Sequence, residues 1–166
     1  RGQNATASLG IMDSQSVRWG NNRSLKGYDG GKKVKGIKRH IVVDKNGFLL
    51  AVMVSVANVH DSKAALLLMK MLTYLLIPLD KILADGGYRG EIIEKIKKQF
   101  NYVVQVVMRS DKKEKEFQPI SKRWIVERTF SWFENDRRLC RNYELLMETS
   151  ENMVKLSAIK LLLNKI

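Results

Sequence analysis

The chain has 166 residues, of which 45% are hydrophobic and 28% are charged, a balance that excludes a disordered chain and is sufficient for one globular core. Lysine and arginine number 30 against 17 aspartates and glutamates, so the formal net charge is +13. This excess predicts a polyanionic partner, either nucleic acid or an anionic membrane surface; a basic surface without a partner is the alternative.

Cysteine content and hydropathy exclude several further classes of protein. The single cysteine, Cys140, rules out an internal disulfide and a cysteine-built zinc cluster, and it favours a reducing cytoplasm. The longest apolar stretch, residues 64–77, is interrupted by Lys70 and is too short to cross a bilayer. No signal peptide is recognisable. Because the chain begins with Arg1 and not Met, we expect a fragment of a longer protein.

The first half of the chain predicts three strands. Residues 9–17 form the first, and a polar, glycine-rich segment over 20–36 follows it, either a long loop or an extended hairpin tip. Residues 39–43 and 48–56, both rich in Val and Ile, form the other two. The sequence Asn46-Gly47 between them is a strong hairpin signal, since both residues tolerate a positive φ. We therefore expect an antiparallel start to the sheet.

The second half predicts alternating helices and strands. An apolar, buried helix over 64–76 is capped within 61–63 and ends before Pro78. The elements expected after it are a strand over 81–85, a helix over 91–100, a strand over 102–108, a loop over 111–118, a helix over 121–133, and a last helix capped by Thr149 or Ser150. This order predicts an α/β fold, with one mixed sheet covered by helices, in a single domain over 1–166.

Two acidic residues interrupt strands that are otherwise apolar. Asp13 follows Ile11 and Met12 inside the first strand, and Asp85 ends the strand over 81–85. An acid in such a position is costly unless it is paired, hydrogen-bonded or bound to a metal ion. Each one alone is more often a cap or turn residue, but two in one sheet indicate a functional site.

Glu127 is the third acidic residue of interest, and it lies on the helix predicted over 121–133. Arg123 precedes it by four residues, so an ordinary surface ion pair is the simplest interpretation. The apolar residues around Glu127 should bury much of this helix, however. A carboxylate at the edge of a buried helix can reach the ends of the strands.

Five short segments, in this order, resemble the DDE transposases of bacterial insertion sequences, in the branch with a Tyr-Arg-Glu-Lys signature. They are 10–17 (GIMDSQSV), 32–36 (KKVKG), 57–62 (ANVHDS), 84–90 (ADGGYRG) and 126–130 (VERTF). The resemblance covers residues 9 to about 144. It implies a ribonuclease H-like fold and a domain that cleaves transposon ends and transfers them into target DNA. It also implies a separate N-terminal DNA-binding domain in the full protein, which we expect to lie outside this chain.

The resemblance assigns the family's catalytic triad to Asp13, Asp85 and Glu127, and the signature arginine to Arg123. The sequence departs from the signature twice: its Tyr corresponds to Ile120 and its Lys to Glu134. Arg137 or Arg138 is a candidate replacement for the missing cation. Among other acids, Glu91, Glu134 and Asp136 remain alternatives to Glu127 as the third carboxylate.

Three carboxylates without a His or Cys cluster favour Mg²⁺ or Mn²⁺ over zinc. Two ions are expected, one beside the attacking oxygen and one beside the leaving oxygen of a phosphodiester. The predicted partner is double-stranded DNA, at both transposon ends and target, with a possible homodimer, no membrane, and a nucleoid-associated location in the bacterial cytoplasm.

Basic and aromatic residues near these acids are candidate DNA contacts. A dense basic run lies beside the second strand and consists of Lys32, Lys33, Lys35, Lys38 and Arg39. It predicts phosphate binding that does not depend on base sequence, with a solvated loop as the alternative. Tyr88 and Arg89 follow Asp85, and Tyr88 is equally well explained by packing. His60 and Asp61 are better explained by a loop and a helix cap than by metal binding. The full set of candidates is Lys32, Lys33, Lys35, Lys38, Arg39, Tyr88, Arg89, Arg123 and Arg128.

Two other functions fit the same acids. A ribonuclease H-like nuclease, such as a junction resolvase, would hydrolyse DNA without strand transfer. A catalytically inactive derivative would keep only DNA binding.

Overall fold

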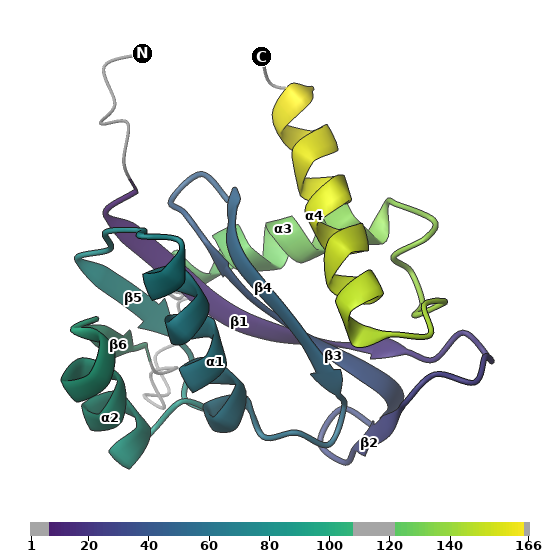
Figure 1. Ribbon diagram of the computed structural model, residues 1–166, viewed down its shortest axis with the longest axis horizontal. Helices are drawn as coiled ribbons and strands as arrows, with labels where there is room; N and C mark the ends of the chain where they lie inside the picture. Colours follow the sequence, from purple (N-terminus) through teal and green to yellow (C-terminus); the bar gives the residue numbers. More distant parts are fainter. Residues whose placement is uncertain (1–6, 108–121, 165–166) are drawn as a thin grey trace, which may run out of the picture.

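The computed structural model describes residues 7–107 and 122–164. In chain order their elements are β1 (Leu9–Arg18), β2 (Gly27–Asp29), β3 (Val34–Val43), β4 (Leu49–Val56), α1 (Asp61–Tyr74), β5 (Lys81–Ala84), α2 (Glu91–Phe100), β6 (Val104–Val106), α3 (Arg123–Glu134) and α4 (Met147–Leu163). The order confirms the predicted alternation, and Figure 1 shows the elements arranged around one twisted sheet.

The sheet is mixed and has β1 near its centre. β3 pairs with β1 in antiparallel fashion, with Asp13 opposite Ile41, and β4 and β2 pair antiparallel with β3. On the other side of β1, β5 runs parallel to it and β6 runs parallel to β5. The prediction of an antiparallel start followed by parallel strands is confirmed.

The hairpin between β3 and β4 forms where Asn46-Gly47 predicts it. The Asp44 carboxylate accepts hydrogen bonds from the backbone N–H groups of Asn46 and Phe48, both at 2.8 Å. Gly47 has a φ of 89°, which a glycine adopts without strain. Of the two interpretations of residues 20–36, the extended hairpin tip agrees better with the structure, because β2 lies in this segment and pairs antiparallel with β3, which begins at Val34.

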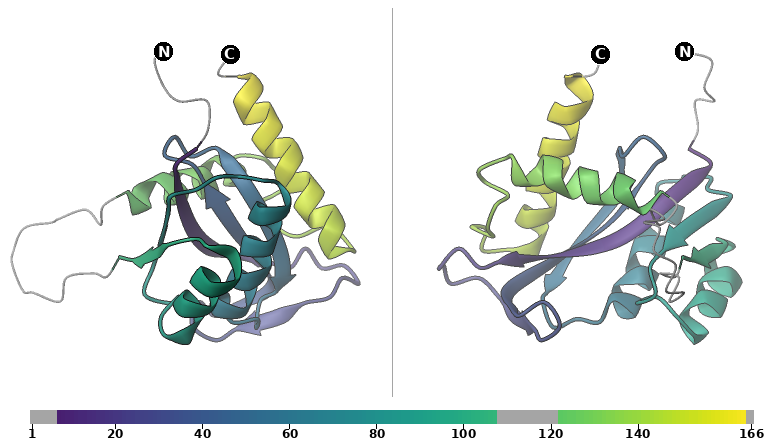
Figure 2. Two further views of the ribbon diagram at one scale, coloured as in Figure 1. Left: turned by 60° about the vertical axis from the view of Figure 1, so that its left-hand side comes forward. Right: turned by 180° about the vertical axis from the view of Figure 1, so that it is seen from behind.

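Two helical layers cover the sheet, with α1 and α2 on one face and α3 and α4 on the other (Figure 2). Alternate residues of a strand point to opposite faces. Met12 and Val42 therefore pack in the core under α1, whereas Ile11 and Ile41 pack in the core under α3 and α4. Asp13 has the same parity as Ile11, so its side chain projects toward the α3 face.

Some element bounds differ from prediction. α1 begins at Asp61, with the His60 side chain accepting a hydrogen bond from the backbone N–H of Ser62. α4 begins at Met147, which places Ser150 inside the helix, where its hydroxyl donates to Asn142. The loop predicted over 111–118 lies outside the described residues. In the two described ranges, none of the helices combines the length and apolarity that crossing a bilayer requires.

Candidate active site

Asp13 lies in the middle of β1 and is only 8% exposed. Its Oδ1 accepts a hydrogen bond of 2.7 Å from the backbone N–H of Ser14. The pKa of the Asp13 carboxyl is raised to about 6. Burial is the main cause and the nearby charge of Asp85 adds to it, while the Ser14 N–H, Arg123 and Lys32 act in the opposite direction. The fold therefore holds a carboxylate where negative charge is poorly stabilised by solvent.

Asp85 follows the last residue of β5. The parallel register of β1 and β5 pairs Ile11 with Leu83, so two residues further on the chains reach Asp13 and Asp85 side by side. The Asp85 Oδ1 accepts a hydrogen bond of 2.9 Å from the Gly87 N–H. A Cβ on Gly87 would lie 3.1 Å from that oxygen, so the glycine leaves the space beside the carboxylate open.

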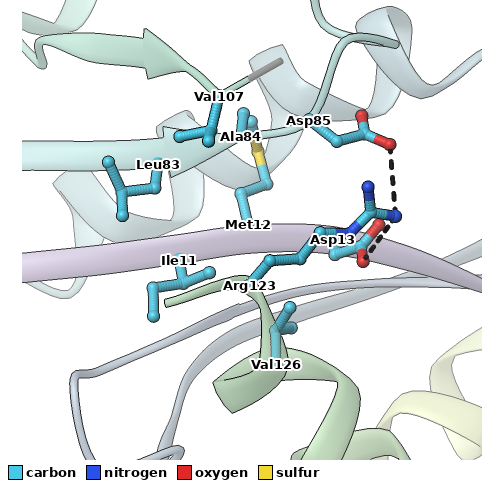
Figure 3. A pocket seen from close by; sticks show the side chains of 9 residues that line it. All are labelled: Ile11, Met12, Asp13, Leu83, Ala84, Asp85, Val107, Arg123 and Val126. Carbon is cyan, nitrogen blue, oxygen red and sulfur yellow. Dashed lines mark ion pairs between the residues drawn. The ribbon is translucent and has the colours of Figure 1, made fainter. Parts of the chain in front are cut away.

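Arg123 joins the two aspartates to the third acid. Its Nη2 lies 3.8 Å from the Asp13 Oδ2 and 3.6 Å from the Asp85 Oδ2, and its Nε lies 3.2 Å from the Glu127 Oε1. Figure 3 shows the guanidinium of Arg123 between the carboxylates of Asp13 and Asp85, at the rim of a pocket floored by Ile11, Leu83 and Val126. Three acids from distant segments thus surround one cation.

The donor set suits a hard divalent ion. Carboxylate oxygens are the ligands that Mg²⁺ prefers, and the pKa of Asp13 is raised chiefly by burial of its carboxyl, beside which a bound cation would stabilise the charged form. The Glu127 side chain is 57% exposed, so it has room to change rotamer. Within residues 7–107 and 122–164, no three His, Cys, Asp or Glu side chains already form a closed ligand cluster. Asp13, Asp85 and Glu127 would hold the ion once Arg123 moves from between them.

The alternative third acids are engaged elsewhere. Glu134 accepts a 2.7 Å hydrogen bond from the Gln15 side chain. Asp136 is bound by Ser157 and by Lys160, the latter at 2.6 Å. Glu91 is 88% exposed at the start of α2 and pairs with Lys95. None of these contacts involves Asp13 or Asp85, which favours Glu127.

The candidate replacements for the signature cation differ from each other. Arg138 is paired with Glu144 at 2.8 Å, whereas Arg137 is exposed. Ile120 lies outside the described residues.

The predicted basic run divides into an exposed part and a buried part. Lys32, Lys33 and Lys35 are exposed, and the Lys32 Nζ donates to the Ser14 carbonyl at 3.0 Å, one residue from Asp13. Lys38 is 7% exposed and lies 3.1 Å from both the Asp61 Oδ1 and the Val59 carbonyl oxygen. The prediction that Lys38 belongs to a DNA-binding surface is therefore wrong, because this lysine is buried and paired inside the protein.

The prediction that Arg39 contacts DNA is wrong for the same reason, since Arg39 is only 2% exposed. Burial lowers the pKa of its guanidinium to about 10. β3 is longer than predicted and lies beside the central strand, so its side chains in this region point into the helical layers on both faces. A charge pattern read along the chain does not reveal that direction.

Tyr88 and Arg89 also behave differently from each other. Tyr88 is 1% exposed, so it cannot stack on DNA bases in this conformation, and its packing interpretation holds. Burial, and then the charges of Asp61, Asp13 and Asp85, raise the pKa of its phenol well above the usual value. Arg89 is exposed and remains a candidate DNA contact.

Arg128 is held between two aromatic rings on α3. Its guanidinium carbon lies 4.7 Å from the ring centre of Trp124 and 4.6 Å from that of Trp132. Its Nη2 donates a 2.7 Å hydrogen bond to the Asn46 carbonyl in the β3–β4 hairpin. These contacts assign Arg128 to fastening the hairpin onto α3, and not to a free DNA-binding cation.

Asp61 is the residue near the site that the sequence interpretation undervalued. Beyond opening α1, it forms an ion pair with Lys38, and its Oδ1 lies 3.8 Å from the Nδ1 of the buried His40. A Cβ on Gly87 would lie 3.9 Å from the Asp61 Oδ2, so Asp61 borders the space beside Asp85. The signal was available, because Asp61 lies in the segment 57–62 on which the family resemblance partly rests.

Comparison with known proteins identifies a family for this chain. The family model for the transposase DDE domain matches residues 4–159. No curated protein sequence matches the chain.

Solved structures share the fold at low sequence identity. A chain of the simian T-cell lymphotropic virus intasome in complex with PP2A regulatory subunit B56 gamma superimposes with a TM-score of 0.60 and 13% identity, over 92% of this chain and 47% of that one. The present chain thus spans about half of that relative. The HTLV-2 integrase catalytic core domain in complex with magnesium, in its dimeric form, gives a TM-score of 0.56 and 16% identity over 94% of this chain and 87% of that one.

The match over most of the sequence and the shared arrangement of strands and helices lead to one assignment. The chain belongs to the transposase DDE domain family, and it shares its fold with the HTLV-2 integrase catalytic core domain.

Proposed function

We propose that Asp13, Asp85 and Glu127 are the catalytic triad of a DNA transposase that cleaves transposon ends and joins them to target DNA. The observation that carries the proposal is the convergence of these three carboxylates on the single guanidinium of Arg123. Membership of the transposase DDE domain family supports the choice of reaction.

The cofactor in this proposal is Mg²⁺ or Mn²⁺, as two ions. Bound there, divalent ions would activate the attacking oxygen and stabilise the leaving oxygen of an in-line displacement. Asp13 and Asp85 supply rigid oxygens from adjacent strands, whereas the exposed Glu127 supplies an adjustable one. The HTLV-2 integrase core was solved in complex with magnesium, which is consistent with this choice.

One site would perform both chemical steps, because only the nucleophile changes. Water attacks in the cleavage step, and the freed 3′ hydroxyl of the transposon end attacks in the joining step. Either nucleophile must lie in line with the leaving oxygen, so the work of the protein is positioning and charge stabilisation.

Double-stranded DNA is the proposed partner, at the transposon ends and at the target. The net charge of +13 and the exposed Lys32, Lys33, Lys35 and Arg89 support it. We further propose homodimeric action at the nucleoid of a bacterial cytoplasm, and membership of the branch with the Tyr-Arg-Glu-Lys signature. Arg123, four residues before Glu127, supports the branch assignment.

The deciding experiment is a strand-transfer assay with precleaved transposon ends and Mg²⁺. We expect joined products from the unmodified protein and a loss of at least about 10³-fold in Asp85→Ala, since the site would lose a metal ligand. Glu134→Ala removes an alternative third acid at the end of α3 and is the control, and its strand-transfer rate should be nearly unchanged.

Each rival function predicts a different result in this assay. Hydrolysis without joined products would indicate a nuclease, and DNA binding with neither product would indicate an inactive derivative. If Asp85→Ala retained full activity, the triad assignment would be wrong.

A further inference from the structure

We propose that Arg123 is the resident counter-cation of the triad and competes directly with divalent metal ions for its carboxylates. Arg123 would then set the metal affinity of the site. This inference rests on the proposed function, because it assumes that the triad binds metal.

The first argument is positional. The Arg123 Nη2 lies within 4 Å of an oxygen of Asp13 and of Asp85 at once, between the two side chains. An ion bound by both aspartates would lie about 2.1 Å from each coordinating oxygen. The guanidinium and that ion would therefore claim the same space, and binding one requires the other to leave.

The second argument is that Arg123 is held loosely. Hydrogen bonds between a guanidinium and a carboxylate measure about 2.7–2.9 Å. The contacts of Nη2, at 3.6 and 3.8 Å, are ion pairs longer than that, and among residues 7–107 and 122–164 the buried Nε has no hydrogen-bond partner of acceptable geometry. Within these residues the contacts of the guanidinium are therefore mainly electrostatic, and little directional bonding to them is lost when it leaves.

The third argument concerns charge. A single guanidinium faces three carboxylates, which carry three negative charges when all are ionised. The one positive charge of Arg123 cannot balance three negative charges at these distances. A divalent ion neutralises more of this charge from the same position.

The displaced guanidinium of Arg123 would be available to bind a DNA phosphate beside the metal. Arg123 is the first residue of α3, and its side chain is 27% exposed, so it can turn outward without unfolding the helix. Arginine binds phosphate oxygens through two parallel hydrogen bonds. A guanidinium released beside the metal would meet the phosphate that arrives there, which couples metal loading to DNA loading.

The competing explanation is that Arg123 only forms an i,i+4 surface pair with Glu127. Such a pair contributes a few tenths of a kcal/mol to helix stability and has no reason to influence metal affinity. Metal binding in the absence of DNA therefore separates the two explanations.

The test is calorimetric titration of DNA-free protein with Mn²⁺ at about pH 8, where protonation of Asp13 does not compete. We expect Arg123→Gln to bind Mn²⁺ at least about threefold more tightly than the unmodified protein and Arg123→Lys to fall between them. Mn²⁺ should also raise the melting temperature of Arg123→Gln more than that of the unmodified protein. Arg137→Gln removes an exposed positive charge near the end of the same helix and should leave Mn²⁺ affinity within about twofold.

Two outcomes would overturn the inference: Arg123→Gln binding Mn²⁺ no more tightly than the unmodified protein, or Arg137→Gln raising the affinity equally. Asp13→Asn and Asp85→Asn distinguish this failure from a failure of the proposed function. If these variants lose Mn²⁺ binding while Arg123→Gln is unaffected, only the inference fails. If they retain it, the metal site itself is misassigned.

Discussion

Two arginines on α3, five positions apart, are held in opposite ways. Arg128 lies between two indole rings and donates a 2.7 Å hydrogen bond to a backbone carbonyl. Arg123 lies among three carboxylates at 3.2–3.8 Å. The sequence predicts both as DNA contacts. The environment of each now separates a structural arginine from an exchangeable one.

The difference follows from what each partner can offer. Stacking and a backbone acceptor fix the orientation of Arg128 and need no further cation. The carboxylates around Arg123 repel one another, and any cation between them reduces this repulsion. A divalent ion, with its higher charge, could therefore take the place of the guanidinium. The same helix therefore fastens the hairpin at one end and completes the candidate active site at the other.

The largest stability effect should come from Arg128→Ala. We expect a loss of about 2–3 kcal/mol in the free energy of unfolding, from one charge-assisted hydrogen bond and two cation–π contacts. Urea denaturation measures it. Arg123→Gln in metal-free protein should lose at most about 1 kcal/mol, because loose ion pairs contribute little. Equal losses in the two variants would contradict the conclusion that Arg128 is held more tightly than Arg123.

Gly47→Ala tests the hairpin side of the contrast. Gly47 has a φ of 89°, and a Cβ there would lie 2.9 Å from the Thr129 hydroxyl oxygen and 3.2 Å from the Arg128 Nη2. We expect a loss of about 1–3 kcal/mol in thermal or urea unfolding. Gly30→Ala is the control, since a Cβ at Gly30 would meet nothing within 4 Å. A neutral Gly47→Ala would contradict a tightly fastened hairpin.

His40 extends the comparison to the opposite face of the sheet. Burial lowers the pKa of its imidazole to about 4, against the raising effect of Asp61, while Lys38 and Lys32 lower it further. Because the unfolded chain takes up this proton near pH 6.5 and the folded chain does not, His40 contributes stability above pH 6.5. That stability is lost as the pH falls toward 4.

Site-specific NMR titration is the right measurement, because the raised pKa of Asp13 acts on stability with the opposite sign over part of this range. The His40 ring should stay neutral to about pH 4, with or without Mg²⁺. A midpoint near 6.5 would show that the imidazole is not buried as described.

The smallest effect should be on DNA binding by the exposed lysines. Replacing Lys33 and Lys35 by Ala should weaken binding to all DNA sequences alike and reduce the slope of log K against log salt by up to about 2, at roughly 0.9 per phosphate contact. Fluorescence anisotropy over a salt series measures this. Lys38→Ala should instead lower stability, since Lys38 is paired inside the protein. A loss confined to particular DNA sequences would indicate base reading.

Much of the fold was predictable from local pattern. The strands containing Asp13 and preceding Asp85, the Asn46-Gly47 hairpin and the helix over 91–100 all form where expected, because hydrophobic periodicity and turn residues act over short distances. Asp13 and Asp85 were also identifiable, because acids in apolar strands need an explanation, whereas the choice of Glu127 rested on the family resemblance. The prediction of Lys38 and Arg39 as DNA contacts was wrong because side-chain chemistry does not reveal which way a strand faces.

The amino-acid sequence by itself determined most of the order of elements, the basic balance of charge and the presence of two unusual carboxylates, Asp13 and Asp85, beside a third candidate, Glu127. Only the tertiary structure decided that these carboxylates surround Arg123, that Arg128 is fastened to the hairpin, and that Asp61 borders the site. The register of β1 against β5 and the packing of α3 on the sheet set those distances. Both depend on contacts between residues far apart in the chain, which local sequence does not encode.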